Sequence, residues 1–168
     1  MKKVIVLIEN LFDEQELVYP YHRLREDYEV HLVGPNKDEI FTGKNGLKLK
    51  STHASNEVDA KDYEGLIIPG GFSPDYMRKT EATKELVKSF DKLNKPIAAI
   101  CHGPWMMASS CDLKGKTVTS TSTIKDDLIN AGANWVSEEV VVDGNLITSR
   151  TPLDLPAFMK AFIKKINI

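Results

Sequence analysis

The segment Pro96-Ile97-Ala98-Ala99-Ile100-Cys101-His102-Gly103-Pro104 decides how this chain is interpreted, because an apolar strand in it runs straight into a cysteine. The small residues Ala99 and Gly103 let the backbone turn sharply beside Cys101 without side-chain collisions. This is the pattern of a nucleophile elbow, with cysteine in place of serine. We expect the helix that begins near Gly103 to favour the thiolate and to make Cys101 nucleophilic near neutral pH. The alternative is a small apolar residue buried at a strand end, since free cysteines are often buried.

Apolar runs elsewhere in the chain alternate with helical patterns. Four short runs are mostly apolar, as in strands of a parallel sheet that is buried on both faces. They are residues 4–8, 30–33, 66–68 and 97–100. Residues 16–25 and 84–93 carry apolar side chains at helical spacing on one face. The alternation predicts an α/β fold in which helices cover a mainly parallel sheet, a three-layer sandwich.

Two further regions complete the predicted fold. Residues 40–49 contain Gly43 and Gly46 between short alternating stretches, which predicts a small peripheral β-ribbon with a structural role. Toward the C-terminus we expect three more strands, at residues 117–120, 140–142 and 146–148. The last two are joined by a turn at Asp143-Gly144.

The last predicted helix begins at Thr151-Pro152-Leu153-Asp154. Thr151 can cap this helix, Pro152 suits its first position, and Asp154 can complete a capping box. Apolar residues then recur at helical spacing and predict a stripe that faces the core. They are Leu155, Phe158, Met159, Phe162, Ile163 and Ile166.

Length and charge exclude several classes of function. With 168 residues, of which 42% are hydrophobic, the chain fits one compact domain spanning residues 1–168. The net charge of −2 leaves no basic stripe for nucleic acid. The apolar run before Glu9 is shorter than the roughly 7 to 15 residues of a secretory signal or the about 20 of a membrane span. We therefore expect a cytoplasmic protein without a membrane partner.

Two segments are predicted to reach the same edge of the sheet as Cys101. Ile68-Pro69-Gly70-Gly71 ends the preceding strand, where open α/β folds bind ligands, and its N–H groups could face an oxyanion. An ordinary Gly-Gly turn is the alternative. A partly buried carboxyl group in the acidic loop at residues 13–16 would have a raised pKa and could exchange a proton with a thiol adduct. We prefer Glu16 for this role over a solvated first helical turn.

The histidines limit the reaction chemistry. His22, His31 and His53 precede the elbow, and no histidine follows His102. Amidotransferase chemistry is thereby disfavoured, because glutamine-hydrolysing enzymes of this architecture use a histidine far downstream of the cysteine. His102 is the remaining candidate base, although a side chain next to its nucleophile in sequence normally diverges from the sulfur. It either needs a partner to orient it or merely lines the pocket. We expect His22 and His31 to be packing or surface residues.

The second cysteine carries no catalytic signal. Cys111 lacks a neighbouring acid or glycine turn and is expected to be a structural thiol. A helix of ten residues would separate it from Cys101 by roughly 15 Å, too far for a disulfide. The sequence has no Cys-x-x-Cys pair, no His-x-x-x-His spacing and no Gly-x-Gly-x-x-Gly after a strand, so we predict neither a metal nor a cofactor.

Four linked segments resemble the PfpI intracellular-protease family. They are residues 16–24 (ELVYPYHRL), 68–78 (IPGGFSPDYMR), 99–104 (AICHGP) and 148–158 (TSRTPLDLPAF), and they span nearly the whole chain in the expected order. This family belongs to a larger group that includes the Parkinson-associated protein deglycase. The resemblance therefore implies a flavodoxin-like, class I amidotransferase-like fold.

The resemblance also implies roles for individual residues. Cys101 matches the family nucleophile, Glu16 the acid that contacts its sulfur, and His102 the proposed base. Gly71 and the backbone of His102 match the proposed oxyanion donors. Asp75 stands where family oligomers offer an acid to the histidine of an adjacent subunit, and some relatives have the longer glutamate there. The resemblance further implies a homodimer or a homohexamer.

Three functions remain open at this point. The leading hypothesis is Cys101-dependent chemistry on small reactive dicarbonyls such as methylglyoxal, or on their early adducts with proteins, as in glyoxalases and deglycases. The second is peptide hydrolysis through an acyl-enzyme, in which His102 must protonate the leaving amine. The third is a non-enzymatic oxidative-stress sensor or chaperone, in which Cys101 oxidises and Glu16 hydrogen-bonds a sulfinate.

Overall fold

The computed structural model describes residues 1–167 and centres on a seven-stranded sheet with the order β10-β11-β7-β6-β1-β2-β5. The strands are β1 (Lys3–Leu7), β2 (Glu29–Gly34), β5 (His53–Ala54), β6 (Leu66–Ile68), β7 (Ile97–Ile100), β10 (Val141–Asp143) and β11 (Leu146–Ser149). Neighbouring strands are parallel except for the antiparallel pair β10 and β11. The predicted mainly parallel sheet is confirmed.

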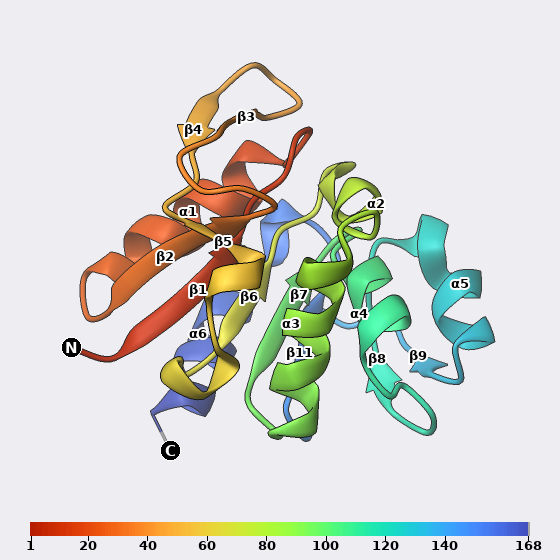
Figure 1. The fold of residues 1–168 in the computed structure, drawn as a ribbon. Coiled ribbons are helices and arrows are strands. Elements are labelled where there is room, and N and C mark those ends of the chain that lie inside the picture. The colour runs from red at the N-terminus through yellow and green to blue at the C-terminus, as the bar shows by residue number, and fades with distance from the viewer. Residues whose placement is uncertain (168) are drawn as a thin grey trace.

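Helices cover both faces of the sheet (Figure 1). α1 (Glu14–Arg25) and α6 (Leu155–Ile166) pack on one face, and α3 (Glu81–Lys92) and α4 (Pro104–Ser110) pack on the other. Successive side chains of a strand point to opposite faces, so β1 must be apolar at every position to serve both layers. Ile5 accordingly belongs to the core under α3 and α4, and Val6 to the core under α1 and α6. The fold is the expected flavodoxin-like three-layer α/β sandwich.

Smaller elements surround these layers. The predicted peripheral ribbon is present as the antiparallel pair β3 (Ile40–Thr42) and β4 (Lys48–Lys50), which stands above the sheet edge in Figure 1. The strand expected at residues 117–120 is shorter than predicted and lies outside the central sheet. It forms β8 (Thr117–Val118), which pairs with β9 (Asn134–Trp135) in a separate two-stranded sheet. Two short helices were not predicted from the sequence, α2 (Ser73–Met77) and α5 (Lys125–Asn130).

The start of the last helix differs from the prediction. Residues 152–154 form a 3₁₀ turn before α6, and the Thr151 side chain makes no cap hydrogen bond. Asp154 instead accepts hydrogen bonds from the Arg150 backbone N–H at 2.9 Å and from the Arg150 guanidinium at 3.0 Å. The predicted capping box is therefore wrong, because the arginine offers the carboxylate a charge-assisted partner. The predicted core stripe of α6 is confirmed at Phe158 and Phe162, which are fully buried.

Candidate active site

A strained turn presents Cys101 at the carboxyl end of β7. Its φ of 63° lies in the left-handed region, which side chains other than glycine rarely adopt and which costs about 1–3 kcal/mol. Hydrogen bonds fix this turn on both sides, since the Cys101 N–H donates to the Ser149 carbonyl at 3.0 Å and its carbonyl accepts from the Thr121 N–H at 2.9 Å. A Cβ atom on Gly103 would come within 2.6 Å of the Ile68 carbonyl oxygen, so only glycine fits there. The predicted elbow geometry is confirmed.

Glu16 reaches the sulfur from α1. Asp13 starts this helix two residues earlier than predicted, because its side chain accepts hydrogen bonds from the Gln15 and Glu16 amides at 3.0 and 3.2 Å. The Glu16 side chain is fully buried beside Cys101, and its Oε1 accepts from the Gly70 N–H at 2.8 Å. A Cβ on Gly70 would lie 2.5 Å from Glu16 Oε1 and 3.0 Å from the Cys101 Cβ. The glycine is therefore what allows the acid and the thiol to meet.

Burial controls the protons of this pair. Burial, with the negative charge of Asp13, raises the pKa of Glu16 to about 8, so this group carries a proton at neutral pH. Burial and the negative charge of Glu16 raise the pKa of Cys101 to about 12. The helix start therefore does not by itself produce the low thiol pKa expected from sequence. Because Glu16 is neutral below pH 8, its repulsion of a thiolate is absent there, and the two groups lose their first proton as a pair.

His102 does not diverge from the sulfur, contrary to the sequence-based expectation. Its Nδ1 lies 3.4 Å from the Cys101 Sγ, and its Nε2 lies 3.4 Å from the Thr123 Oγ1. The Trp105 ring is tilted against the imidazole with a centroid distance of 5.0 Å. Burial and the positive charge of Lys44 lower the pKa of His102, so the imidazole is neutral at pH 7. A neutral imidazole beside a thiol can accept its proton.

The predicted oxyanion donors are the backbone amides of His102 and Gly71, and this role stays a prediction. The His102 N–H lowers the pKa of the Cys101 thiol. Gly71 adopts a φ of 70° and pairs with Phe12, and a Cβ there would come within 2.4 Å of the Leu11 carbonyl oxygen. Among the backbone hydrogen bonds of turns and loops in residues 1–167, none has the His102 N–H or the Gly71 N–H as its donor.

Asp75 does not meet His102 within one subunit. Its Oδ1 accepts a hydrogen bond from the Arg78 Nη2 at 2.6 Å, and its side chain is 41% exposed. The Arg78 guanidinium lies over the Trp105 ring, 5.1 Å from the centroid. The aspartate therefore lies on α2 at the rim of the site, and among residues 1–167 the contacts that link it to His102 run through Arg78 and Trp105. A contact with an adjacent subunit stays a prediction.

Three residues of the site were not predicted from the sequence. Thr123 and Trp105 contact the His102 ring, as described above, and Lys44 contributes its charge from the peripheral ribbon. No local pattern marks Lys44, because only the docking of the ribbon brings it near Cys101.

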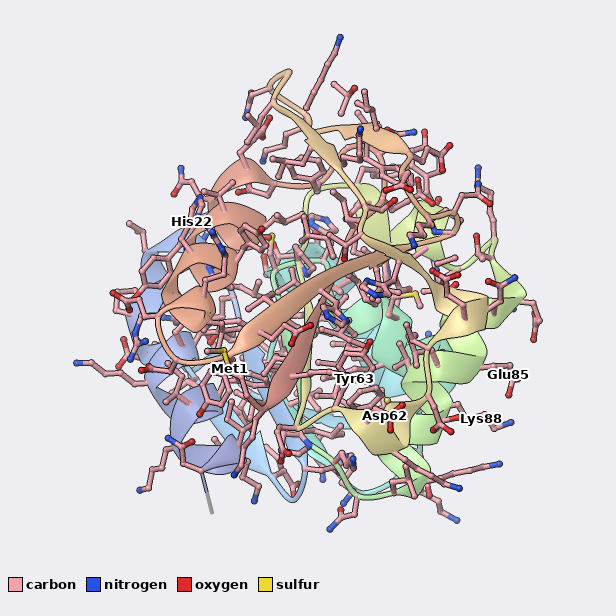
Figure 2. The ribbon with its side chains drawn as sticks, turned by 60° about the vertical axis from the view of Figure 1, so that its left-hand side comes forward. Met1, His22, Asp62, Tyr63, Glu85 and Lys88 are labelled. Atoms are coloured by element: carbon pink, nitrogen blue, oxygen red, sulfur yellow. The ribbon has the colours of Figure 1, made fainter. Side chains whose placement is uncertain are left out.

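The remaining histidines lie outside the site. His22 is exposed on the outer side of α1 (Figure 2). His31 is buried, with its Nδ1 2.8 Å from the Tyr63 hydroxyl and its ring stacked on His53 at a centroid distance of 3.9 Å. These are the surface and packing positions expected for His22 and His31.

Cys111 has the features of a structural thiol. It is free, packs against the core, and has a pKa raised by burial. Among residues 1–167, no three His, Cys, Asp or Glu side chains come together as they would to hold a metal ion. A search of the same residues finds no helix with the length and hydrophobicity required to cross a bilayer.

Known proteins resemble this chain over almost its whole length. The model of the DJ-1/PfpI family matches residues 2–165. A deglycase of Pyrococcus abyssi is 43% identical over 162 residues, which cover 96% of this chain and 98% of that protein. The Bacillus subtilis protein YraA, whose name assigns it provisionally to the cysteine proteases, is 44% identical over 158 residues, 94% of each chain.

A solved structure agrees with this assignment. A two-domain protein of Anabaena variabilis, with a DJ-1/ThiJ/PfpI-like and a ferritin-like domain, matches with a TM-score of 0.97 and 37% identity. The match covers 99% of this chain and 48% of that longer protein. The elbow, the family match and the relatives above 40% identity lead to one conclusion: the chain belongs to the DJ-1/PfpI family.

Proposed function

We propose that this protein is a cysteine-dependent enzyme that acts on small reactive dicarbonyls, or on their early adducts with proteins. The observation that carries the proposal is the meeting of three groups at Cys101. These are the protonated and buried Glu16, the neutral imidazole of His102 at 3.4 Å, and the amide of His102. This set can move protons and hold an oxyanion at a carbonyl carbon bonded to sulfur.

In the first step the sulfur adds to the aldehyde carbon of the dicarbonyl. The thiol proton passes to His102, the S–C bond forms, and the C=O electron pair moves onto oxygen. The amides of Gly71 and His102 hold the resulting oxyanion until it takes a proton, and a hemithioacetal is formed. The pKa of about 12 for the thiol includes the repulsion of an ionised Glu16. We propose that, while Glu16 is still protonated, the sulfur loses its proton first and the Glu16 O–H hydrogen-bonds the thiolate without transferring its proton.

In the second step the hemithioacetal rearranges without an external oxidant. The hydrogen on its C1 leaves as a proton, an enediol forms, and a proton returns to C2, so C1 is oxidised while C2 is reduced. Glu16 and His102 are the groups that can carry this proton. Water then attacks the thioester, the S–C bond breaks, and the Cys101 thiol is regenerated. When the substrate is methylglyoxal, the product released is lactate. Because both electrons stay within the substrate, these steps need no cofactor.

The names of the relatives support this class of chemistry, because the Pyrococcus abyssi relative is named as a deglycase. A second candidate is peptide hydrolysis at the same cysteine. It is favoured by the short distance between the His102 Nδ1 and the Cys101 Sγ, and by the provisional protease name of YraA. A third candidate is the oxidation sensor. Within the described residues, the buried Glu16 Oε2 accepts no hydrogen bond from a nitrogen or oxygen donor, and it could bond a sulfinic acid.

One comparison separates the three functions. The wild type, Cys101→Ser and the matched control Cys111→Ser are incubated with methylglyoxal and, after removal of contaminating proteases, with casein. Lactate from the wild type and from Cys111→Ser, but not from Cys101→Ser, supports the dicarbonyl reaction. Peptide release without lactate would replace it with the peptidase. If neither product forms and mild peroxide adds about 32 Da to Cys101 selectively, the sensor is the better account.

We also propose an oligomer in which Asp75 contributes to the site of a neighbour. Its exposure of 41% and its place on the rim leave it accessible to a second subunit. In a homodimer or homohexamer, its carboxylate would orient the imidazole of the neighbour's His102. Sedimentation of the wild type and of Asp75→Asn, with lactate formation by each, tests this arrangement.

A further inference from the structure

The peripheral ribbon is docked tightly against the start of α1. The Glu14 carboxylate accepts hydrogen bonds from the Asn45 N–H at 2.8 Å, from the Asn45 Nδ2 at 3.2 Å and from the Leu47 N–H at 3.3 Å. A Cβ on Gly43 would come within 2.5 Å of Glu14 Oε2. The ribbon is therefore held in one position on the edge of the sheet where Cys101 lies.

This docking delivers the side chain of Lys44 to the site. The Lys44 N–H donates to the Phe12 carbonyl at 2.9 Å, and its Nζ lies 2.7 Å from Oδ2 of Asp13. Asp13 is 6% exposed and forms the cap of α1, bonded to the Glu16 amide. The lysine thus compensates a buried negative charge one helical turn from the acid that contacts the sulfur.

The charges around Cys101 show what the lysine does. Four groups act on the thiol: the charges of Glu16, Asp13 and Lys44 shift its pKa, and the His102 Nδ1 lies 3.4 Å from its sulfur. Among these four, Lys44 is the cation at neutral pH, since Asp13 raises its pKa and His102 is neutral. Its charge lowers the pKa of Cys101 and of His102. Both effects favour a thiolate beside a neutral base.

We propose that Lys44 is a positioning residue of the active centre, whose ammonium group neutralises Asp13 and stabilises the thiolate of Cys101. The ribbon, expected from sequence to be structural, would then be part of the reactive site. This inference rests on the proposed function only in taking Cys101 as the nucleophile.

The test measures the thiol directly and needs no substrate. The full-length protein is alkylated with iodoacetamide between pH 5 and 10, and mass spectrometry follows labelling at Cys101. We expect Lys44→Met to move the midpoint of the rate profile upward by about 0.3 pH unit, which is roughly a twofold loss of rate at pH 7, because the lysine side chain is 47% exposed. Lys44→Arg should restore the wild-type midpoint. Lys48→Met, which removes an exposed charge from the same ribbon, should leave it unchanged.

A second variant separates the charge from the hydrogen bond. Lys44→Gln keeps a donor for Asp13 but carries no charge, so its midpoint should move as far as that of Lys44→Met. An unchanged midpoint in either uncharged variant, or an equal shift in Lys44→Arg, would overturn the inference. A wild type that labels normally but makes no lactate would instead refute the proposed function and leave the role of Lys44 standing.

Discussion

Replacing Glu16 by glutamine should stabilise the protein at neutral pH while impairing its chemistry. In the folded chain, burial raises the pKa of Glu16 from 4.5 to about 8. Between these values the folded state holds a proton that the unfolded state has released, so the free energy of unfolding falls as pH rises through this window. Glutamine removes this linkage, because it is neutral in both states. It also keeps an Oε1 that can accept the Gly70 N–H.

The size of the effect follows from the pH interval. From pH 4.5 to pH 7 the linkage costs the folded state about 3 kcal/mol, at about 1.36 kcal/mol per pH unit. For a chain of this length, Glu16→Gln should therefore raise the melting temperature at pH 7 by about 6–12 °C. At pH 4 the unfolded Glu16 is also protonated, so the advantage should disappear.

Calorimetry of the wild type and Glu16→Gln measures the difference in melting temperature at pH 4 and at pH 7. Glu85→Gln is the matched control, because Glu85 is an exposed carboxylate on α3 (Figure 2). Its melting temperature should stay within about 2 °C of the wild type, as for most surface substitutions. If Glu16→Gln melts with the wild type at both pH values, Glu16 ionises as an ordinary carboxyl group and the reasoning about the pair is refuted.

Three other substitutions test separate parts of the structure. Gly70→Ala should abolish lactate formation and lower stability, because its Cβ would meet Glu16 Oε1 at 2.5 Å; wild-type activity in this variant would contradict the close approach. Lys95→Met should lower the free energy of unfolding in urea by about 2 kcal/mol, since the Lys95 ammonium donates to three carbonyls at 2.7–3.0 Å, whereas Lys92→Met at an exposed position should not. His53→Gln should reduce the decrease in the free energy of unfolding that accompanies a fall in pH from 7.5 to 5.5. Burial and His31 lower the pKa of His53, so the unfolded state binds more protons below about pH 6.5, and an identical pH dependence in both proteins would contradict this.

The parts of the fold that sequence could predict are those fixed by local composition. The strand at residues 97–100 is apolar throughout because both faces of β7 are covered, and the same run leads into Cys101. Glu16 was identified because parallel strands end at one edge of the sheet, which brings the loop after β1 beside the elbow. Such inferences need only the order of strands and helices.

The parts that sequence could not predict depend on tertiary contacts. Lys44 lies far from Cys101 along the chain and reaches the site only through the hydrogen bonds between Glu14 and the ribbon. The protonation of Glu16 follows from complete burial, which an acidic loop does not suggest. The predicted capping box failed for a similar reason, because the side chain of Arg150 folds back onto Asp154.

The most direct test of the account is the pH dependence of Cys101 alkylation in the otherwise unmodified protein. If the first proton lost by the pair comes from the sulfur, the rate should show one inflection well below pH 12, the value to which burial and the charge of Glu16 raise the pKa of the thiol. A rate that climbs without inflection beyond about pH 10 would mean that burial leaves the thiol inert, and it would contradict both the enzymatic and the sensor proposals.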